Sequence, residues 1–286
     1  MSRVDQFESI FRSATKEVYQ YQDIGMEKLL VVTDKNQTDS EQFSSIIKKF
    51  LHALTAKHEL SWELLNGDDF TTSADLLEQV GKRSPDLICT YRNLHSKAWQ
   101  FPHSLGTHLD VLLQQTSKPV LVLPHPDAEY AAGHALGNTD TVMAITNHLA
   151  ADHNLIDYAA LVTEPGGTLY LSHIEDNLIF ERYMEAIAKI DTIDTDNARQ
   201  RLAEQLLKEP EDYADSCSKA LAATDRHLRV ESMVSFGHSL SDYKRYIQEY
   251  KIDLLVMHAK DHDQLAMHGL AYPLAIELRE IPLLMI

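Results

Sequence analysis

Residues 230–260 have the sequence VESMVSFGHSLSDYKRYIQEYKIDLLVMHAK, and this stretch decides the fold. Its first part predicts a strand that ends at the turn residue Gly237. Residues 243–250 predict a helix, and the apolar run at 253–257 predicts a strand buried on both faces. A strand, a helix and a second buried strand in this order are typical of a parallel sheet covered by helices.

The same alternation continues through the rest of this half of the chain. Apolar runs predict further strands at residues 142–146, 169–173 and 281–286. A long helical stretch covers about residues 178–223. We expect Pro210 to break this stretch, because proline has no amide proton to donate and its ring clashes with the preceding turn.

The first half of the chain repeats the pattern with one strand fewer. Apolar runs predict strands at residues 28–34, 62–68, 86–90 and 118–123. Segments with apolar residues at helical spacing separate these strands. The sequence therefore predicts an α/β protein with a doubly wound parallel sheet in each of two tandem domains.

Two pairs of residues place the halves in register. Gly106 precedes Pro119 by thirteen residues, and Gly269 precedes Pro282 by the same thirteen. We interpret this agreement as the mark of a duplication. The predicted organisation is a helical arm at residues 1–26, a shortened domain at 27–125, a linker at 126–140 and a second domain at 141–286.

The predicted arm has apolar residues close to helical spacing between Phe7 and Tyr21. We expect a helix that packs on its own domain, as terminal helices commonly do. An arm that completes a homodimer is the alternative.

Composition and charge limit the classes of function. The formal net charge of −17 would repel a phosphate backbone, and the basic residues do not cluster, so we expect no direct binding to nucleic acid. No apolar run is long enough for a membrane span, and acidic residues interrupt residues 1–26, so we expect neither a membrane protein nor an exported one. The two cysteines, Cys89 and Cys217, fall in a predicted buried strand and a predicted helix without CxxC spacing, which favours a cytoplasmic location.

The order of these elements, with the segments LYLSHIED, PDLICTYRN and SLGTHLDVLLQQTSKPVLVLP beside the stretch quoted above, resembles the universal stress protein family. The resemblance covers about residues 27–124 and 141–286. It implies that the two domains pack as an internal pseudo-dimer through their closing strands, pairing residues 120–123 with 283–286. It also implies a binding or regulatory protein of the stress response without catalysis of its own.

Nucleotide-binding members of this family carry a glycine, two residues, a second glycine, nine residues, and then glycine with Ser or Thr. Glycines let the backbone approach the phosphates, and the amides at a helix start favour negative charge. Counted back from Gly106 and Thr107, the earlier glycine positions fall on Ser96 and Asn93, while Asp34 stands where the family contacts the base or ribose. The resemblance thus implies a degenerate cofactor site at Asp34, Asn93, Ser96, Gly106 and Thr107, where ATP is possible.

The second domain departs further from this motif. Leu270 follows Gly269, Ala259 and Val256 occupy the earlier glycine positions, and Asn147 replaces the aspartate. Pro273 removes an amide from the first turn of the following helix. We therefore expect no nucleotide in this domain.

Histidines offer the alternative interpretation. Several of the fifteen lie on the predicted loops beyond the strand ends, namely His95, His103, His108, His148, His258, His262 and His268. Ligands bind at that edge of an α/β sheet, and the spacing of His258 and His262 is compatible with a shared metal ion. A metal-dependent or nucleotide-hydrolysing enzyme is therefore the rival hypothesis. Because no cysteine or HExxH pattern accompanies these histidines and no GxSxG motif occurs, we assign no metal ligand and no catalytic residue.

Overall fold

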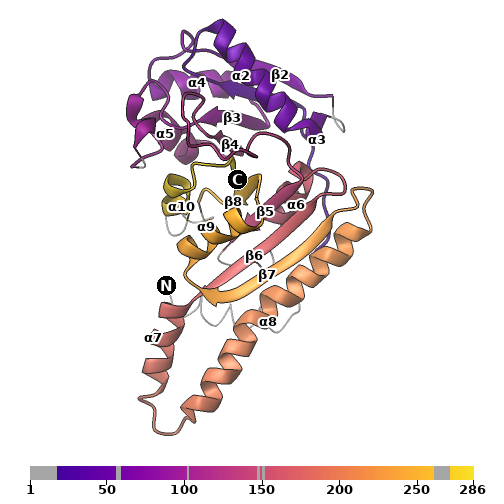
Figure 1. Cartoon of the computed structure of the whole chain (residues 1–286), viewed down its shortest axis with the longest axis vertical. Coiled ribbons are helices and arrows are strands. Elements are labelled where there is room, and N and C mark those ends of the chain that lie inside the picture. Colours follow the sequence, from indigo (N-terminus) through magenta and orange to yellow (C-terminus); the bar gives the residue numbers. More distant parts are fainter. Residues whose placement is uncertain (1–17, 56–58, 102, 147–148, 150–151, 261–270) are drawn as a thin grey trace.

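The computed structural model describes residues 18–55, 59–101, 103–146, 149, 152–260 and 271–286. Within these ranges nine strands form one mixed sheet in the order β2-β1-β3-β4-β9-β8-β5-β6-β7, with helices packed on it (Figure 1). The strands are β1 (Lys28–Val32), β2 (Ser61–Leu65), β3 (Leu87–Tyr91), β4 (Val120–Leu123), β5 (Thr141–Ile145), β6 (Thr168–Asp176), β7 (Arg229–Gly237), β8 (Leu254–Met257) and β9 (Leu283–Met285). The helices are α2 (Gln37–Phe50), α3 (His52–Thr55), α4 (Ser73–Arg83), the 3-10 turn η1 (Lys97–Gln100), α5 (Thr107–Gln115), α6 (His153–Val162), α7 (Asn177–Ile187), α8 (Thr195–Ala222), α9 (Ser239–Glu249) and α10 (Ala271–Glu277).

The sheet divides into two parallel parts at a single antiparallel pair. β1 to β4 are parallel to one another, and so are β5 to β9. Between them β4 runs antiparallel to β9, with Leu121 opposite Leu284. This arrangement confirms the predicted α/β fold and the predicted pairing of the closing strands.

Within the described residues, the first part of the sheet has one outer strand fewer than the second. The order β2-β1-β3-β4 of the first part matches the order β6-β5-β8-β9 of the second part. The second part adds β7 outside β6. In the second part, α7, α8 and β7 stand between β6 and α9, whereas in the first part β2 leads directly to α4. The four strands predicted for the first half and the five predicted for the second are therefore both present.

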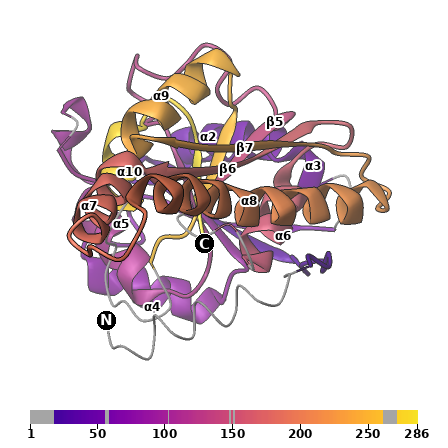
Figure 2. The same ribbon diagram turned by 90° about the horizontal axis from the view of Figure 1, so that it is seen from below.

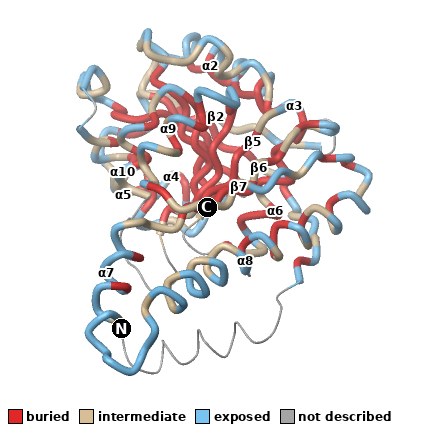
Figure 3. The backbone as a smooth tube through the Cα atoms, turned by 60° about the horizontal axis from the view of Figure 1, so that its bottom comes forward, coloured by how far each residue is buried: buried red, intermediate tan, exposed pale blue. Residues whose placement is uncertain are grey.

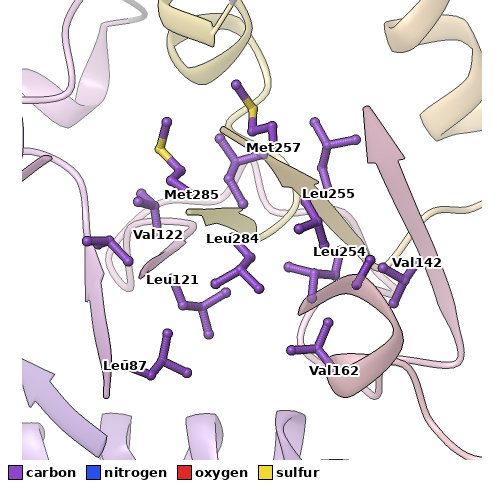
Figure 4. Packing of buried hydrophobic residues seen from close by; sticks show 14 of the residues in the cluster. Leu87, Leu121, Val122, Val142, Val162, Leu254, Leu255, Met257, Leu284 and Met285 are labelled. Atoms are coloured by element: carbon purple, nitrogen blue, oxygen red, sulfur yellow. The ribbon is translucent and has the colours of Figure 1, made fainter. Parts of the chain in front are cut away.

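One continuous hydrophobic core joins the two parts. Every residue of β3, β4, β8 and β9 is buried, as expected for strands covered by helices on both faces. Leu121 and Val122 lie in the same cluster as Leu284, Met285 and Leu255 (Figure 4). Because each such side chain stabilises the fold by about 1.5–3 kcal/mol when buried, the β4–β9 junction is held by packing as well as by backbone hydrogen bonds.

Residues 18–27 cross from one half to the other. They are not helical, and Tyr19 is buried against the second half. Its amide donates to Ser216 Oγ at 3.1 Å, and its hydroxyl donates to Asp157 Oδ1 at 2.5 Å. The prediction that the arm packs on its own domain is wrong for this segment, because the partners of the Tyr19 side chain lie on α6 and α8. Residues 1–17, which carry the rest of the predicted helix, lie outside the described residues.

The long helical stretch breaks in a different place from the one predicted. Residues 188–194 separate α7 from α8, and Asp194 caps α8 by accepting from the Asn197 amide at 3.2 Å. Pro210 lies inside α8, which continues through it. Although an internal proline costs about 3 kcal/mol, the following turns of α8 bury Tyr213, Cys217 and Leu221 against the sheet, and this packing keeps the helix intact.

Two further predictions concern the cysteines and membranes. Cys89 on β3 and Cys217 on α8 are both buried free thiols. Burial raises the pKa of both, that of Cys217 to about 12, so neither is a reactive thiolate at neutral pH. No helix of the described ranges is long and apolar enough to cross a membrane.

Candidate functional site

The candidate site lies at the carboxyl ends of β1 and β3. From β1 the chain passes through α2 to β2 on one side, whereas β3 leads through α5 to β4 on the other. At such a reversal of direction the connections diverge and leave a crevice, which is where open α/β sheets bind ligands. Asp34 follows β1, and Tyr91 ends β3.

The Asp34 carboxylate already has partners on both oxygens. One oxygen accepts a very short hydrogen bond from the Tyr91 hydroxyl, and the other accepts from the His95 amide at 2.7 Å. The amide of Asp34 donates to the same tyrosine oxygen at 3.1 Å. Burial raises the pKa of Tyr91, so its hydroxyl remains a donor at neutral pH. A ligand that binds Asp34 must therefore share these oxygens with partners from within the chain or displace one of them.

Asn93 and Gly106 are packed backbone to backbone. Asn93 has a φ of 62° and its amide donates to the Leu105 carbonyl at 2.7 Å. Gly106 has a φ of +92°, and a Cβ atom there would lie 2.6 Å from Cα of Asn93. Asparagine adopts the left-handed conformation more readily than other residues with a side chain. The loop thus has, at Asn93, the backbone conformation that a glycine would adopt.

Ser96 and Thr107 lie in different surroundings. Ser96 is exposed and caps η1, where its hydroxyl accepts from the Ala98 amide at 3.1 Å. Its side chain is therefore committed to its own turn. Thr107 is the exposed first residue of α5, at the helix end where backbone amides favour a negative charge.

Hydrogen bonds and close packing join four of the five predicted site residues in one loop system. These four are Asp34, Asn93, Ser96 and Gly106. The amide of His95 binds Asp34, and the amide of Ser96 donates to the Asn93 carbonyl at 3.0 Å. Asn93 in turn holds Gly106 at the start of α5. Thr107 follows as the next residue of the chain.

A group of aromatic side chains beside Asp34 was missed by the sequence reasoning. The rings of Tyr91 and His125 are 4.9 Å apart, and Trp99 stacks on His125 at 4.7 Å with an angle of 16°. Burial lowers the pKa of His125 to about 4, so its ring is neutral and accepts from the Asp127 amide at 3.1 Å. The only signal in the sequence was the position of Trp99 and His125 on the loops after β3 and β4.

The histidines of the first half pack on aromatic rings. His95 and His108 are 5.4 Å apart and both contact Phe70, while His103 stacks on Phe101. No group of three or more histidine, cysteine or acidic side chains in the described part of the chain is placed to hold a metal ion.

In the second half, His258 pairs with an acid on another element. Its Nε2 lies 2.8 Å from Oδ2 of Asp152, the residue that caps α6. His148, His262 and His268, which the metal hypothesis also invokes, lie outside the described residues. A site shared by His258 and His262 thus stays a prediction.

Of the residues that argue against a nucleotide in the second half, Val256 and Ala259 are buried at the end of β8. Pro273 lies in the first turns of α10. Asn147, Gly269 and Leu270 lie outside the described residues.

Two solved structures are similar to this chain over most of its length. One is a protein of unknown function from Pseudomonas aeruginosa PAO1, with 13% identity, a TM-score of 0.50 and coverage of 92% of both chains. The other is a candidate universal stress protein from Pseudomonas aeruginosa UCBPP-PA14, with 12% identity, a TM-score of 0.51 and coverage of 92% of this chain and 93% of that one. No family model matches the sequence, and no curated protein matches it. The chain therefore has the fold of universal stress proteins.

Proposed function

We propose that this protein is a binding and regulatory protein of the universal stress protein kind, which holds ATP weakly in its first half and turns over no substrate. The observation that carries the proposal is the close packing of Gly106 on Asn93 at the start of α5. The Asn93 backbone fills the space that a side chain at position 106 would need, and this holds the loop after β3 against the start of α5, where backbone amides favour an anion.

The residues present fit a nucleotide in part. The amides at the start of α5 and the Thr107 hydroxyl would hold phosphate oxygens, and Asp34 would contact the ribose or the base. A bound nucleotide would supply a charge and a shape that partner proteins can recognise. The role of the chain is to bind and present it.

The same contacts explain why binding should be weak. The ligand must share the Asp34 oxygens with Tyr91 and the His95 amide or displace one of them, and either reduces the energy gained on binding. The Ser96 side chain is held in the η1 turn, because its oxygen accepts from the Ala98 amide. We expect a dissociation constant on the order of 0.1–1 mM.

The proposal of no turnover rests on the groups around Asp34. Its neighbours are a protonated tyrosine, a neutral buried histidine and an indole ring. Hydrolysis of the ligand would use a water activated by a general base, whereas both Asp34 oxygens and His125 Nδ1 already accept hydrogen bonds from within the chain. The candidate site therefore favours binding over catalysis.

Titration calorimetry with ATP and magnesium tests the proposal. The wild type should bind, while Asp34→Ala and Thr107→Val should each weaken binding at least threefold. Thr116→Val, at the other end of α5, is the matched control and should bind as the wild type does. Unchanged binding in both site variants would remove the proposed site. Release of phosphate above the buffer rate would contradict the absence of catalysis.

A further inference from the structure

The helices α7 and α8 form a hairpin that stands out from the sheet. The C-terminal half of α8 packs along β7, but α7 and the beginning of α8 extend beyond the strands (Figures 1 and 2). Most of this projecting part is exposed (Figure 3). Several of its apolar side chains therefore stay exposed.

The helix α7 has apolar residues on two sides. On the inner side Phe180 and Met184 are buried, with the Phe180 ring 4.9 Å from that of Phe236 on β7. The outer side carries Ile179, Tyr183 and Ala186, which we call the outer seam, and all three are exposed. Ile179 and Tyr183 are 50% and 62% accessible. The inner side of α7 has partners on β7 and on α8, where Arg199 lies over the Phe180 ring, whereas the outer seam stays exposed in the described part of the chain.

The spacing within the outer seam indicates the kind of partner. Its residues are separated by four and then three positions, which is the repeat with which one helix packs along another. Ile190 and Ile193, in the turn before α8, are exposed as well. A sheet edge or an extended peptide would not match this repeat, so the partner surface is helical.

The concentration of exposed apolar residues supports an interaction surface. Ten large hydrophobic residues in the described part of the chain are exposed, and six of them lie between residues 178 and 202. Such clustering on one projecting element differs from the scattered exposure of ordinary surfaces.

Charge identifies a second copy of this chain as the occupant. Residues 177–208 contain five basic and six acidic residues, a net charge of −1, whereas the whole chain carries −17. Two copies repel one another over most of their surface, but this repulsion is nearly absent at the hairpin. A twofold axis would bring two hairpins together as a four-helix bundle and cover both outer seams at once.

We propose that the outer seam of α7 is the interface of a homodimer built from two α7–α8 hairpins. Since a seam of three residues gives a small interface, monomer and dimer should exchange at protein concentrations on the order of 1–10 μM. Dimerisation at the hairpin would leave the β1–β3 edge open, so it is independent of nucleotide binding.

Sedimentation velocity from 0.5 to 100 μM tests this proposal. The wild type should pass from monomer to dimer over this range, and the double variant Ile179→Lys with Tyr183→Glu should stay monomeric. Both side chains are exposed in the single chain, so these substitutions should not disturb folding, which circular dichroism can check. Ile46→Lys is the control, because Ile46 is 44% exposed on α2 of the other half. This variant should dimerise as the wild type does.

Hydrogen exchange at the two ends of this concentration range locates the interface. Amides of residues 177–190 should exchange at least fivefold more slowly at 100 μM. The segment 1–17 is the competing occupant, and Phe7→Ser with Phe11→Ser in the full chain should leave the dimer intact under the proposal. A wild type that is monomeric throughout, a dimer that survives the double substitution, or a dimer lost on changing Phe7 and Phe11 would overturn it.

Discussion

Gly106 lies so close to Asn93 that a Cβ atom at position 106 would be 2.6 Å from the Asn93 Cα. Both residues have positive φ angles, and the Asn93 amide is held by the carbonyl of the residue before Gly106. This contact fixes the loop after β3 against the start of α5. It therefore determines whether the two ends of the candidate site stay together.

Replacing Gly106 by alanine should destabilise the protein by about 2–4 kcal/mol, because the new Cβ meets backbone atoms and the φ of +92° strains a side chain. Urea unfolding measures the loss. Gly81→Ala on α4 is the matched control, since no atom lies within 4 Å of its Cβ position. That variant should be neutral or more stable by up to about 1 kcal/mol. Equal effects of the two substitutions would contradict the role given to the Gly106 contact.

Most of the strands could be predicted because they are short apolar runs between turn residues. The pairing of residues 120–123 with 283–286, in which Leu121 lies opposite Leu284, was implied by the resemblance to the universal stress protein family. The break in the long helical stretch was misplaced, because local propensity at Pro210 was outweighed by the burial of Tyr213 and Leu221 against the sheet. Tertiary packing of this kind leaves no local signal.

The candidate site was only partly predictable for a similar reason. Counting from Gly106 located Asn93, but the spacing could not show that Asn93 would take the left-handed conformation of a glycine. Nor could it show that Tyr91 would occupy the Asp34 carboxylate. Both features depend on contacts between loops that are far apart in the sequence.

The contact of Tyr19 with Asp157 links the N-terminal segment to the second half. Tyr19→Phe should cost about 1–2 kcal/mol, because it removes a buried donor from a carboxylate whose pKa burial already raises. Thermal unfolding measures the change. Tyr21→Phe is the control, because the Tyr21 hydroxyl donates to the exposed Asp23, two residues along the chain. A Tyr19 variant as stable as the Tyr21 variant would show that this link contributes little.

Asp253 should make stability depend on pH. Burial and the neighbouring Asp140 raise the pKa of this carboxyl to about 7. The pKa of this carboxyl in the unfolded chain is near 4, so between about pH 4 and 7 the folded protein keeps a proton that the unfolded chain has released. The stability that this proton provides is therefore lost as the pH rises from about 4 through 7.

Asp253→Asn should abolish this part of the pH dependence and stabilise the protein at pH 8 by about 1–3 kcal/mol. The amide oxygen can still accept from Thr141, whose N–H lies 3.1 Å from Asp253 Oδ2. Urea unfolding at intervals between pH 4 and 8 measures the difference from wild type. If the free energy of unfolding of the variant differs from that of the wild type by the same amount at every pH in this range, Asp253 is excluded as the source of the pH dependence.

Tyr91→Phe should strengthen ATP binding. The substitution frees one Asp34 oxygen for the ligand, and a hydrogen bond of this kind corresponds to about a threefold to tenfold change in affinity. Calorimetry with ATP and magnesium measures the gain. Tyr130→Phe, on the segment after β4, is the control and should leave the affinity unchanged. Weaker binding in the Tyr91 variant would indicate that the tyrosine hydroxyl contacts the ligand instead of competing with it.

The most direct test of the account is a crystal structure of the protein soaked with ATP and magnesium. The account predicts a nucleotide between Asp34 and the start of α5, with the Tyr91 hydroxyl displaced from the carboxylate and the γ-phosphate intact. A nucleotide bound in the second half, or an unchanged Tyr91–Asp34 contact with no nucleotide at millimolar ATP, would contradict it.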